Sequence, residues 1–483
     1  MPRELCIVEP PPERGHSIIT LLSLAQFQGT LSTPLKEHSY PGSHVDQQVK
    51  ERLLASIEAN RLVILIGAGL SMAPPSQLPS AAAVAADCFD RYTAGANPNL
   101  DPALRENLEA LAEYFFARNT LETVFISRLV PWQRFVRPPN AGHAALADFL
   151  TTRVVAAALS SNYDILVEQA AWNYGARLTG ALDGDEANVH AASHSPLLKF
   201  HGCAIRDPKA TVWTKLQLNQ GALSDRIEKS RTWMQSILRE KDLLVVGFWS
   251  DWSYLNEILG NALSNVSPLS VTLVDPSTSA DLEAKAPALW TLAHKPGVTF
   301  SHVQASGHTV LDELRRAFSL RFLRLVLRAG VAPLQSETEA PCQPEWLEPP
   351  DLDAESLYDL RRDAEGVPAG SPATRREPDN NELLGFFHLL LRRAGATPVA
   401  GGYEIKGQRV RVLNGAGQIL SRLRDRFQEA PVLNSANVVA AIGATDLATP
   451  GNVVRSGRSG DIIRPAAQAR WVDFRDARQL LDV

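Results

Sequence analysis

Three short motifs place polar or glycine residues directly after apolar segments. They are RLVILIGAGLS at residues 61–71, SSNYD at 160–164 and KFHG at 199–202. Glycines after a buried strand let the main chain approach a phosphate closely. Asn162 and Asp164 supply hydrogen-bonding groups, and the imidazole of His201, with an ordinary pKa of about 6.5, can accept a proton near neutral pH. This combination predicts a phosphate-containing ligand and acid–base chemistry.

Each motif also has a purely structural interpretation. Gly67 and Gly69 could simply tighten a strand-to-helix turn, Asn162 could be a turn residue, and Asp164 could cap the following helix. Among the histidines, His201 is the best candidate for a general base because an apolar segment precedes it and a glycine follows it. His143 is expected to pack or to cap a helix, and His194 lies in a polar loop.

The motifs lie in a chain of alternating strands and helices. Helices are expected at residues 48–59, 81–92, 103–119 and 310–322, and apolar strands at 62–66, 154–159, 197–200, 242–246, 270–274 and 298–303. Strands that end in glycine or polar residues and alternate with helices predict an α/β fold with a doubly wound, mainly parallel sheet. In such sheets ligands bind beyond the carboxyl ends of the strands.

Composition divides the chain into four parts. Residues 1–45 are expected to be an N-terminal arm and 46–330 the α/β domain. Residues 331–380 contain 12 acidic and 4 basic residues, which predicts a solvated or partly ordered linker. Residues 381–483 contain 14 basic residues, 13 of them arginine, and 9 acidic residues, and we expect a smaller C-terminal α+β module there.

Charge and cysteine content exclude several classes of protein. The net charge of −5 suggests neither a polycation that binds nucleic acid nor an acidic disordered chain. The four cysteines lie far apart and form no CxxC pair, which disfavours a disulfide framework and a cysteine zinc site. No apolar stretch approaches the roughly 18 residues of a membrane span. We therefore expect a cytoplasmic protein that contacts no membrane.

The order and spacing of the three motifs resemble those of the Sir2 (sirtuin-like) family. The resemblance covers about residues 50–325 and is most specific in PPNAGHAALADFL followed by VVAAALSSNYDILVE. It implies a Rossmann-like sheet that binds NAD+. It further implies that Asn162 contacts the nicotinamide ribose or a water, that Asp164 holds the loop and the nicotinamide amide, and that His201 is the catalytic base.

The chain departs from the deacylating sirtuins at two places. Ser80 and a run of alanines stand where those enzymes usually carry an aromatic–arginine pair, and residues 202–241 contain one cysteine, Cys203, where the family inserts a zinc module. A four-thiolate site cannot be built there, so no metal is expected. The next strand ends in GFWSD (247–251), which resembles the Sir2-like domains of bacterial antiphage proteins that hydrolyse NAD+. The resemblance implies these cofactor-binding residues: Gly67, Ala68, Gly69, Ser71, Gly247, Asp251, Asp275 and Gly307.

We therefore expect an NAD+ glycohydrolase that acts as the effector of a bacterial antiphage defence system by depleting NAD+. By analogy with such systems, the C-terminal module or a partner holds the enzyme inactive. The partner could be another copy of the chain or a protein that senses the invader, of Argonaute-like or ATPase type. The arginine-rich end, densest at Arg422, Arg424 and Arg426, could instead meet nucleic acid. Two alternatives stay open: an NAD-dependent protein deacylase and a non-catalytic module that binds NAD or ADP-ribose.

Overall fold

The computed structural model describes residues 45–95, 99–219, 221–265, 269–366, 381–427, 436–445 and 469–483. The expected N-terminal arm, apart from Val45, lies outside the described residues, and so do residues 367–380 of the expected linker. Within the described part, no helix combines the length and the apolar character needed to cross a membrane.

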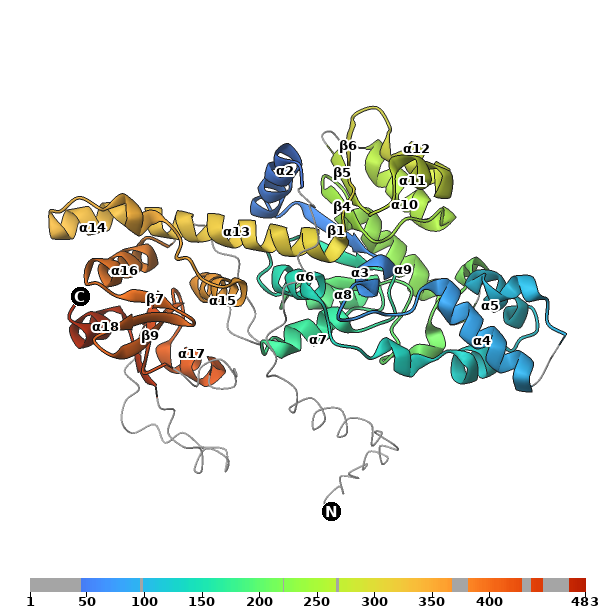
Figure 1. The fold of residues 1–483 in the computed structure, drawn as a ribbon, viewed down its shortest axis with the longest axis horizontal. Coiled ribbons are helices and arrows are strands. Elements are labelled where there is room, and N and C mark those ends of the chain that lie inside the picture. The colour runs from blue at the N-terminus through green and yellow to red at the C-terminus, as the bar shows by residue number, and fades with distance from the viewer. Residues whose placement is uncertain are drawn as a thin grey trace, which may run out of the picture. The chain divides into compact units, whose positions relative to one another are not determined.

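A six-stranded parallel sheet forms the centre of the structure (Figure 1). Its strand order is β3-β2-β1-β4-β5-β6, and adjacent strands pair in parallel. The first five strands in sequence are almost continuous apolar runs and are buried along their length, as expected of a parallel sheet covered on both faces. The strands are β1 (Leu62–Ile66), β2 (Ala157–Ser160), β3 (Leu197–Lys199), β4 (Asp242–Val246), β5 (Leu269–Val274) and β6 (Val298–Val303).

The strand order reverses at β1. Ile66 at the end of this strand pairs with Ser160 of β2 on one side and Val246 of β4 on the other. The crevice that such a reversal opens at the carboxyl edge is the usual ligand site of a doubly wound sheet. The segments after β1, β2 and β4 therefore meet at this edge, as the sequence predicts.

Helices cover both faces of the sheet, because successive strand residues point to opposite faces. Ile64 and Ile66 belong to one hydrophobic core with α2, α6, α7 and α13, whereas Val63 and Leu65 belong to another with α8 to α12. These helices are α2 (Gln47–Glu58), α6 (Ala141–Thr151), α7 (Leu166–Asn173), α8 (Gly184–His190), α9 (Gly221–Ile237), α10 (Ser253–Ser264), α11 (Ser279–Lys285), α12 (Pro287–Ala293) and α13 (Gly307–Ala329).

A helical segment between β1 and α6 has a core of its own. One helix was expected over residues 103–119, but the structure has a 3-10 turn followed by a separate helix. The side chain of Asn107 accepts a hydrogen bond from Ala110 N and so caps the start of this second helix. The segment consists of α3 (Ala68–Met72), α4 (Ala81–Gly95), η1 (Pro102–Arg105), α5 (Leu108–Phe116), a π-helix η2 (Leu121–Leu129) and η3 (Trp132–Phe135).

The C-terminal region contains a second, mixed sheet of five strands in the order β11-β10-β9-β8-β7. Strands β9, β10 and β11 pair in parallel, and β7, β8 and β9 form an antiparallel meander. The elements are α14 (Val331–Thr338), η6 (Pro344–Leu347), α15 (Ala354–Glu365), α16 (Glu382–Arg393), β7 (Thr397–Val399), β8 (Gly402–Ile405), β9 (Gln408–Asn414), α17 (Leu420–Phe427), β10 (Val438–Ile442), β11 (Arg470–Val472) and α18 (Phe474–Leu481). The expected division of the chain into four parts stays a prediction.

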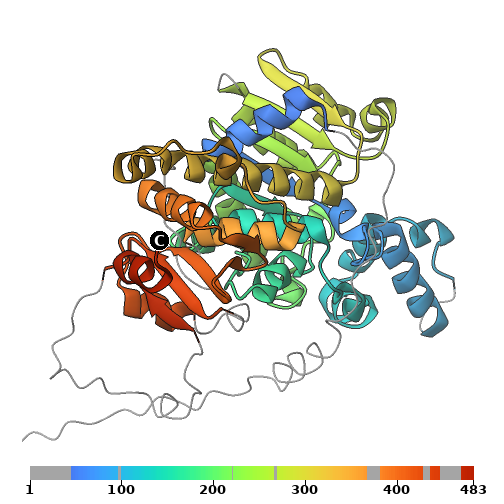
Figure 2. The same cartoon turned by 60° about the vertical axis from the view of Figure 1, so that its left-hand side comes forward.

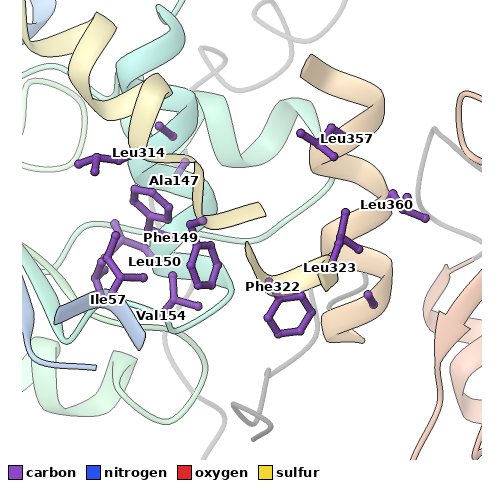
Figure 3. Packing of buried hydrophobic residues seen from close by; sticks show 14 of the residues in the cluster. Ile57, Ala147, Phe149, Leu150, Val154, Leu314, Phe322, Leu323, Leu357 and Leu360 are labelled. Atoms are coloured by element: carbon purple, nitrogen blue, oxygen red, sulfur yellow. The ribbon is translucent and has the colours of Figure 1, made fainter. Parts of the chain in front are cut away.

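Helix α15 lies within the acidic stretch that was expected to be a solvated linker, yet it is largely buried. It packs along α13, together with α16, as the two views of the ribbon illustrate (Figure 1, where the helices are labelled, and Figure 2). Figure 3 shows Leu357 and Leu360 of α15 in the same hydrophobic core as Phe149 of α6 and Phe322 of α13. Net charge misled the sequence interpretation, because charged side chains of α15 are paired inside the protein.

Buried ion pairs explain how a helix in an acidic stretch can lie inside the protein. Asp148 of α6 lies 2.6 Å from the Nε atom of Arg315 in α13 and also contacts Arg361 of α15, and all three side chains are almost fully buried. Asp363 of α15 makes two hydrogen bonds of 2.7 Å with the guanidinium of Arg411 in β9. The charges of α15 thus tie it to α6, which covers the first sheet, and to β9 of the second sheet.

Candidate functional site

Three glycines hold the loops after β1 and β4 in direct backbone contact. Gly67 N donates to Val246 O at 3.0 Å, and Gly69 N donates to Gly247 O at 3.0 Å. A Cβ atom on Gly69 would lie 2.8 Å from Gly247 Cα, and one on Gly247 would lie 2.5 Å from Leu70 N. Gly247 also has a φ of +61°, which favours glycine. These two amides of the Gly67-Ala68-Gly69 turn are therefore already engaged by β4.

The hydroxyl of Ser71, from the first motif, connects Asn162 and Asp164 of the second motif with His143 of α6. Its Oγ atom donates to Asp164 Oδ2 at 3.0 Å, and Asn162 Nδ2 donates to it at 3.1 Å. The Nε2 atom of His143 lies 3.1 Å from the same oxygen. A hydroxyl has one donor and two acceptor positions, so this geometry uses all of them.

The tautomer of His143 follows from its second contact. The Nδ1 atom accepts a hydrogen bond from Asn140 N at 3.2 Å, and a backbone amide can only donate, so the ring proton lies on Nε2 and points to Ser71. Burial, reinforced by the charge of His308, lowers the pKa of His143 to about 3, so the ring is neutral. His143 forms a capping box with Asn140 at the start of α6, which confirms its predicted capping role.

Asn162 has one acceptor left for a ligand. Its Nδ2 atom uses both protons, donating to Gly67 O and to Ser71 Oγ at 3.1 Å each. The described residues provide no hydrogen bond to its Oδ1 atom, which can accept from a ligand hydroxyl or a water. Asn162 is 7% exposed, so this acceptor has a fixed orientation.

Asp164 is buried beside a lysine that the sequence analysis did not single out. Burial raises the pKa of Asp164 despite the opposing charge of Lys199 and the hydrogen bonds from Leu166 N and Ser71. Lys199 at the end of β3 donates to Asp164 O and lies 3.2 Å from Glu168 Oε1. Burial would lower the pKa of Lys199, but Glu168 and the neighbouring groups outweigh it and raise the pKa. A charged residue within the apolar run LLKFHG is the sequence signal for this pair.

His201 has a ring nitrogen, Nε2, without a partner in the described part of the chain. It is 6% exposed, and its Nε2 atom makes no hydrogen bond to any described residue. Burial lowers its pKa to about 3, against a hydrogen bond to the backbone of Ser161 that raises it. The ring lies 4.3 Å from the ring of Trp252.

The loop that contains Asn162 and Asp164 also brings His201 close. The ring of Tyr163 stacks on Trp213 with centroids 4.5 Å apart and lies 6.4 Å from the imidazole of His201. A pocket of about 110 Å³ opens against this loop. Its walls come from the glycine turn, the loop after β2 and the helical segment: Ala68, Ser71, Leu78, Pro79, Ala81, Val84, Leu108, Phe135, Ser161, Asn162, Tyr163, Asp164 and Trp213.

The other residues predicted to bind a cofactor have structural partners here. Asp251 accepts hydrogen bonds from Ala288 N and Leu289 N and so caps α12. Asp275 accepts from Ser277 N at 2.9 Å in a local turn. A Cβ atom on Gly307 would lie 2.3 Å from Val246 Cγ1, so this glycine lets α13 begin against β4. Their roles in cofactor binding stay predictions.

The comparison with protein families found a SIR2-like domain at residues 156–291. Among solved structures, a Sir2 homologue in complex with NAD is 17% identical, and the alignment covers 58% of this chain and 96% of that chain with a TM-score of 0.33. A mutant Sir2 homologue in complex with ADP-ribose is 16% identical, with coverages of 56% and 98% and a TM-score of 0.33. The comparison with curated proteins gave no match.

The family match runs from the start of β2 to α12 and includes the predicted residues Asn162, Asp164, His201 and Gly247. The fold predicted from the sequence is confirmed by the parallel sheet and its strand order. Residues 156–291 of this chain thus match a SIR2-like domain.

Proposed function

We propose that this chain is an NAD+ glycohydrolase that cleaves the bond between nicotinamide and ribose. The observation that carries the proposal is the fixed loop after β2, which holds the Oδ1 acceptor of Asn162 and lies beside the imidazole of His201. Asn162 Oδ1 and His201 Nε2 are both without a partner among the described residues. Both groups lie at the carboxyl edge of the sheet, where doubly wound folds bind nucleotides. The SIR2-like domain match spans both residues and supports NAD+ as the ligand.

The reaction needs little from the protein beyond orientation and one base. Nicotinamide leaves as a neutral molecule while positive charge develops on the ribose, as in glycoside cleavage. Water adds to the ribose carbon, His201 accepts its proton at Nε2, and the products are ADP-ribose and nicotinamide. Asn162 Oδ1 orients the water or a ribose hydroxyl. A positioned base whose pKa lies near the working pH contributes roughly 10²- to 10⁴-fold to such a step, and the pKa of about 3 places His201 at the low end of that range.

The pocket beside Asn162 fits one end of the substrate. Its volume of about 110 Å³ is well below the roughly 300–1,000 Å³ of sites that enclose a whole small molecule. We assign it to the nicotinamide end, with Phe135 and Trp213 as apolar walls. The ribose then extends past Asn162.

Hydrolysis is favoured over protein deacylation by what the sequence lacks. Residues 202–241 contain a single cysteine, so the four-thiolate zinc module of the deacylases cannot form there. A deacylase releases nicotinamide only when an acyl-lysine peptide is supplied, whereas a glycohydrolase releases it from NAD+ and water. A non-catalytic binding module would bind NAD+ and release nothing.

The biological role that we propose is NAD+ depletion during bacterial antiphage defence, with activity restrained by the C-terminal region or a partner. The support is the resemblance of GFWSD (247–251) to the domains of such systems. The buried contacts of α15 with α6 and β9 give the C-terminal sheet a physical connection to the helix that carries His143.

The experiment follows NAD+ and nicotinamide by chromatography in cells that express the wild-type chain, Asn162→Ala or His201→Ala, with and without its genomic neighbours and phage challenge. NAD+ should fall only with the intact site. Asn265→Ala, an exposed asparagine whose side chain bonds within its own helix end, is the matched control and should behave like wild type. Constant NAD+ in all conditions, with equal phenotypes for wild type and Asn162→Ala, would reject the hydrolase.

A further inference from the structure

Three polar groups around the candidate base are buried without hydrogen-bond partners among the described residues. They are Nε2 of His201, the hydroxyl of Tyr254, and all three guanidinium nitrogens of Arg226. Buried polar groups are almost always hydrogen-bonded in native proteins. A guanidinium has five donors to satisfy, so Arg226 is the largest such exception around His201.

These groups belong to one cluster of side chains. The ring of His201 lies 4.3 Å from Trp252 and 4.5 Å from Phe200, and Tyr254 lies 5.9 Å from Trp252 and 6.4 Å from Phe200. Arg226 is on α9, which packs against α10, the helix that carries Tyr254. The packing of α9 on α10 brings Arg226 to the side of this cluster that carries Tyr254, and its charge has a lowering effect on the pKa of both His201 and Tyr254.

The acidic residues that act on Arg226 are engaged elsewhere. Asp207 and Asp183 each accept a backbone amide from the helical turn that follows them. Glu186 pairs with Arg206 through both of its carboxylate oxygens. Burial lowers the pKa of Arg226 even though all three acids raise it. The guanidinium nitrogens of Arg226 are therefore buried without a direct counter-charge from the described part of the chain, although the residue as a whole is partly exposed.

We propose that Arg226 and the hydroxyl of Tyr254 form a subsite that binds a phosphate or carboxylate group next to His201. A guanidinium matches the planar or tetrahedral oxygens of such anions and binds them through paired hydrogen bonds. Arg226, Trp252 and Tyr254 are each only half-buried, so the cluster lies near the surface. The anion is either a phosphate of the dinucleotide or a group on a second molecule, and its identity as part of NAD+ rests on the proposed function.

Calorimetric titration of the purified chain with inorganic phosphate tests the subsite. Arg226→Met should weaken phosphate binding by at least about tenfold, since charge-assisted hydrogen bonds are lost, and Tyr254→Phe should weaken it less. Arg231→Met is the matched control: Arg231 lies on the same helix and pairs with Glu257, and its loss should leave phosphate binding unchanged.

Thermal unfolding separates binding from a structural role. Removal of an unpaired buried cation should leave the unfolding temperature of Arg226→Met equal to or above that of the wild type in the absence of phosphate. A lowered unfolding temperature together with unchanged phosphate affinity would overturn the proposal. So would a wild-type protein that binds neither phosphate nor nicotinamide mononucleotide.

Two related ligands identify the source of the anion. If the subsite binds a phosphate of the dinucleotide, Arg226→Met should weaken the binding of nicotinamide mononucleotide. The binding of nicotinamide riboside, which has no phosphate, should stay unchanged. If Arg226→Met weakens inorganic phosphate alone, the subsite serves a second molecule. Asn162→Ala should retain phosphate binding. Phosphate binding that depends on Arg226 in a protein that never cleaves NAD+ would support the subsite and reject the hydrolase, so the two proposals can fail separately.

Discussion

Ser71 donates its hydroxyl proton to Asp164, and the 3.0 Å hydrogen bond joins the turn after β1 to the loop after β2. The same oxygen accepts from Asn162 and from the neutral ring of His143. Two strands and helix α6 are thereby fixed around one atom. The orientation of Asn162 Oδ1, the acceptor assigned to the substrate, depends on this network.

Replacement of Ser71 by alanine should destabilise the protein and loosen the candidate site. The substitution removes a buried partner from Asp164, Asn162 and His143, and each unsatisfied group costs about 1–3 kcal/mol. We expect a loss of at least about 2 kcal/mol in the free energy of unfolding, measured in urea. Ser127→Ala, at an exposed hydroxyl that bonds within its own helix, should change stability by less than about 0.5 kcal/mol. Equal losses in the two variants would refute the network.

Gly247→Ala should separate backbone strain from the close approach of the two loops. Gly407 has a similar positive φ of +72°, but a Cβ atom added there would meet no other atom within 4 Å. Gly407→Ala should therefore cost only about 1–2 kcal/mol for the left-handed conformation. Gly247→Ala adds a contact of 2.5 Å with Leu70 N and should cost roughly 1–3 kcal/mol more. Denaturant unfolding of both variants measures the difference, and a difference of zero would mean that the β1 and β4 loops can separate freely.

Asp148→Asn should unfold the junction between α6, α13 and α15. The substitution removes the counter-charge of two buried arginines, Arg315 and Arg361, and breaking such a pair from one side costs about 3–5 kcal/mol. Asp87→Asn, at a more exposed pair with Arg134, should cost no more than about 1 kcal/mol. Thermal unfolding monitored by circular dichroism compares the two. Similar shifts would show that the buried network contributes little.

The same carboxylate predicts an acid dependence. Burial would raise the pKa of Asp148, but Arg361, Arg315 and Arg362 outweigh burial and lower it far below the ordinary value. Since the folded pKa is depressed, the stabilisation is present above the unfolded pKa of about 3.9 and is lost as the pH falls below it. In Asp148→Asn the loss of unfolding free energy that comes from protonation of this carboxylate should disappear. Urea unfolding of the wild type and the variant across that pH range measures the difference.

Stability should also depend on pH in a second, higher range, because some buried histidines stay neutral in the folded protein. Burial, with a smaller effect of Arg392, lowers the pKa of His388 to about 3. The unfolded chain takes up this proton below about pH 6.5 and the folded chain does not, so stability falls as the pH drops through 6.5. His388→Gln should reduce the loss between pH 6.5 and 5.5 by about 1 kcal/mol, measured by urea unfolding at both pH values. Parallel curves for wild type and variant would contradict the prediction.

The sequence allowed the parallel sheet to be predicted almost strand by strand. β1, β4 and β6 begin and end where expected. For β1 and β4 the reason is that buried parallel strands are apolar on both faces and end abruptly in glycine. The meeting of Gly67, Asn162 and Gly247 at one edge followed from the parallel direction alone. The SIR2-like resemblance was visible for the same reason, since the motifs follow the strand ends.

Partners across the fold could not be read from the sequence. Nothing near Ser71 in the chain indicates that its hydroxyl bonds Asp164 and His143, 93 and 72 residues away. Arg226 has no motif around it, and only the packing of α9 on α10 brings it near Tyr254. Long-range side-chain pairing depends on how helices dock, and local sequence patterns do not encode docking.

By itself the sequence determined the succession of strands along the chain, the edge at which the polar loops gather and the choice of His201 as the candidate base, because these depend on local apolar runs and turn residues. The tertiary structure alone decided which groups are free to act. In the fold, the amides of Gly67 and Gly69 donate hydrogen bonds to β4 and the residue after it, and Asp251 caps the first turn of α12. Asn162 Oδ1 and His201 Nε2 have no partners among the residues that the structure describes. It also turned an acidic stretch into a buried helix, because the charges of Arg361 and Asp363 are neutralised by Asp148 and Arg411, which lie far away in the chain.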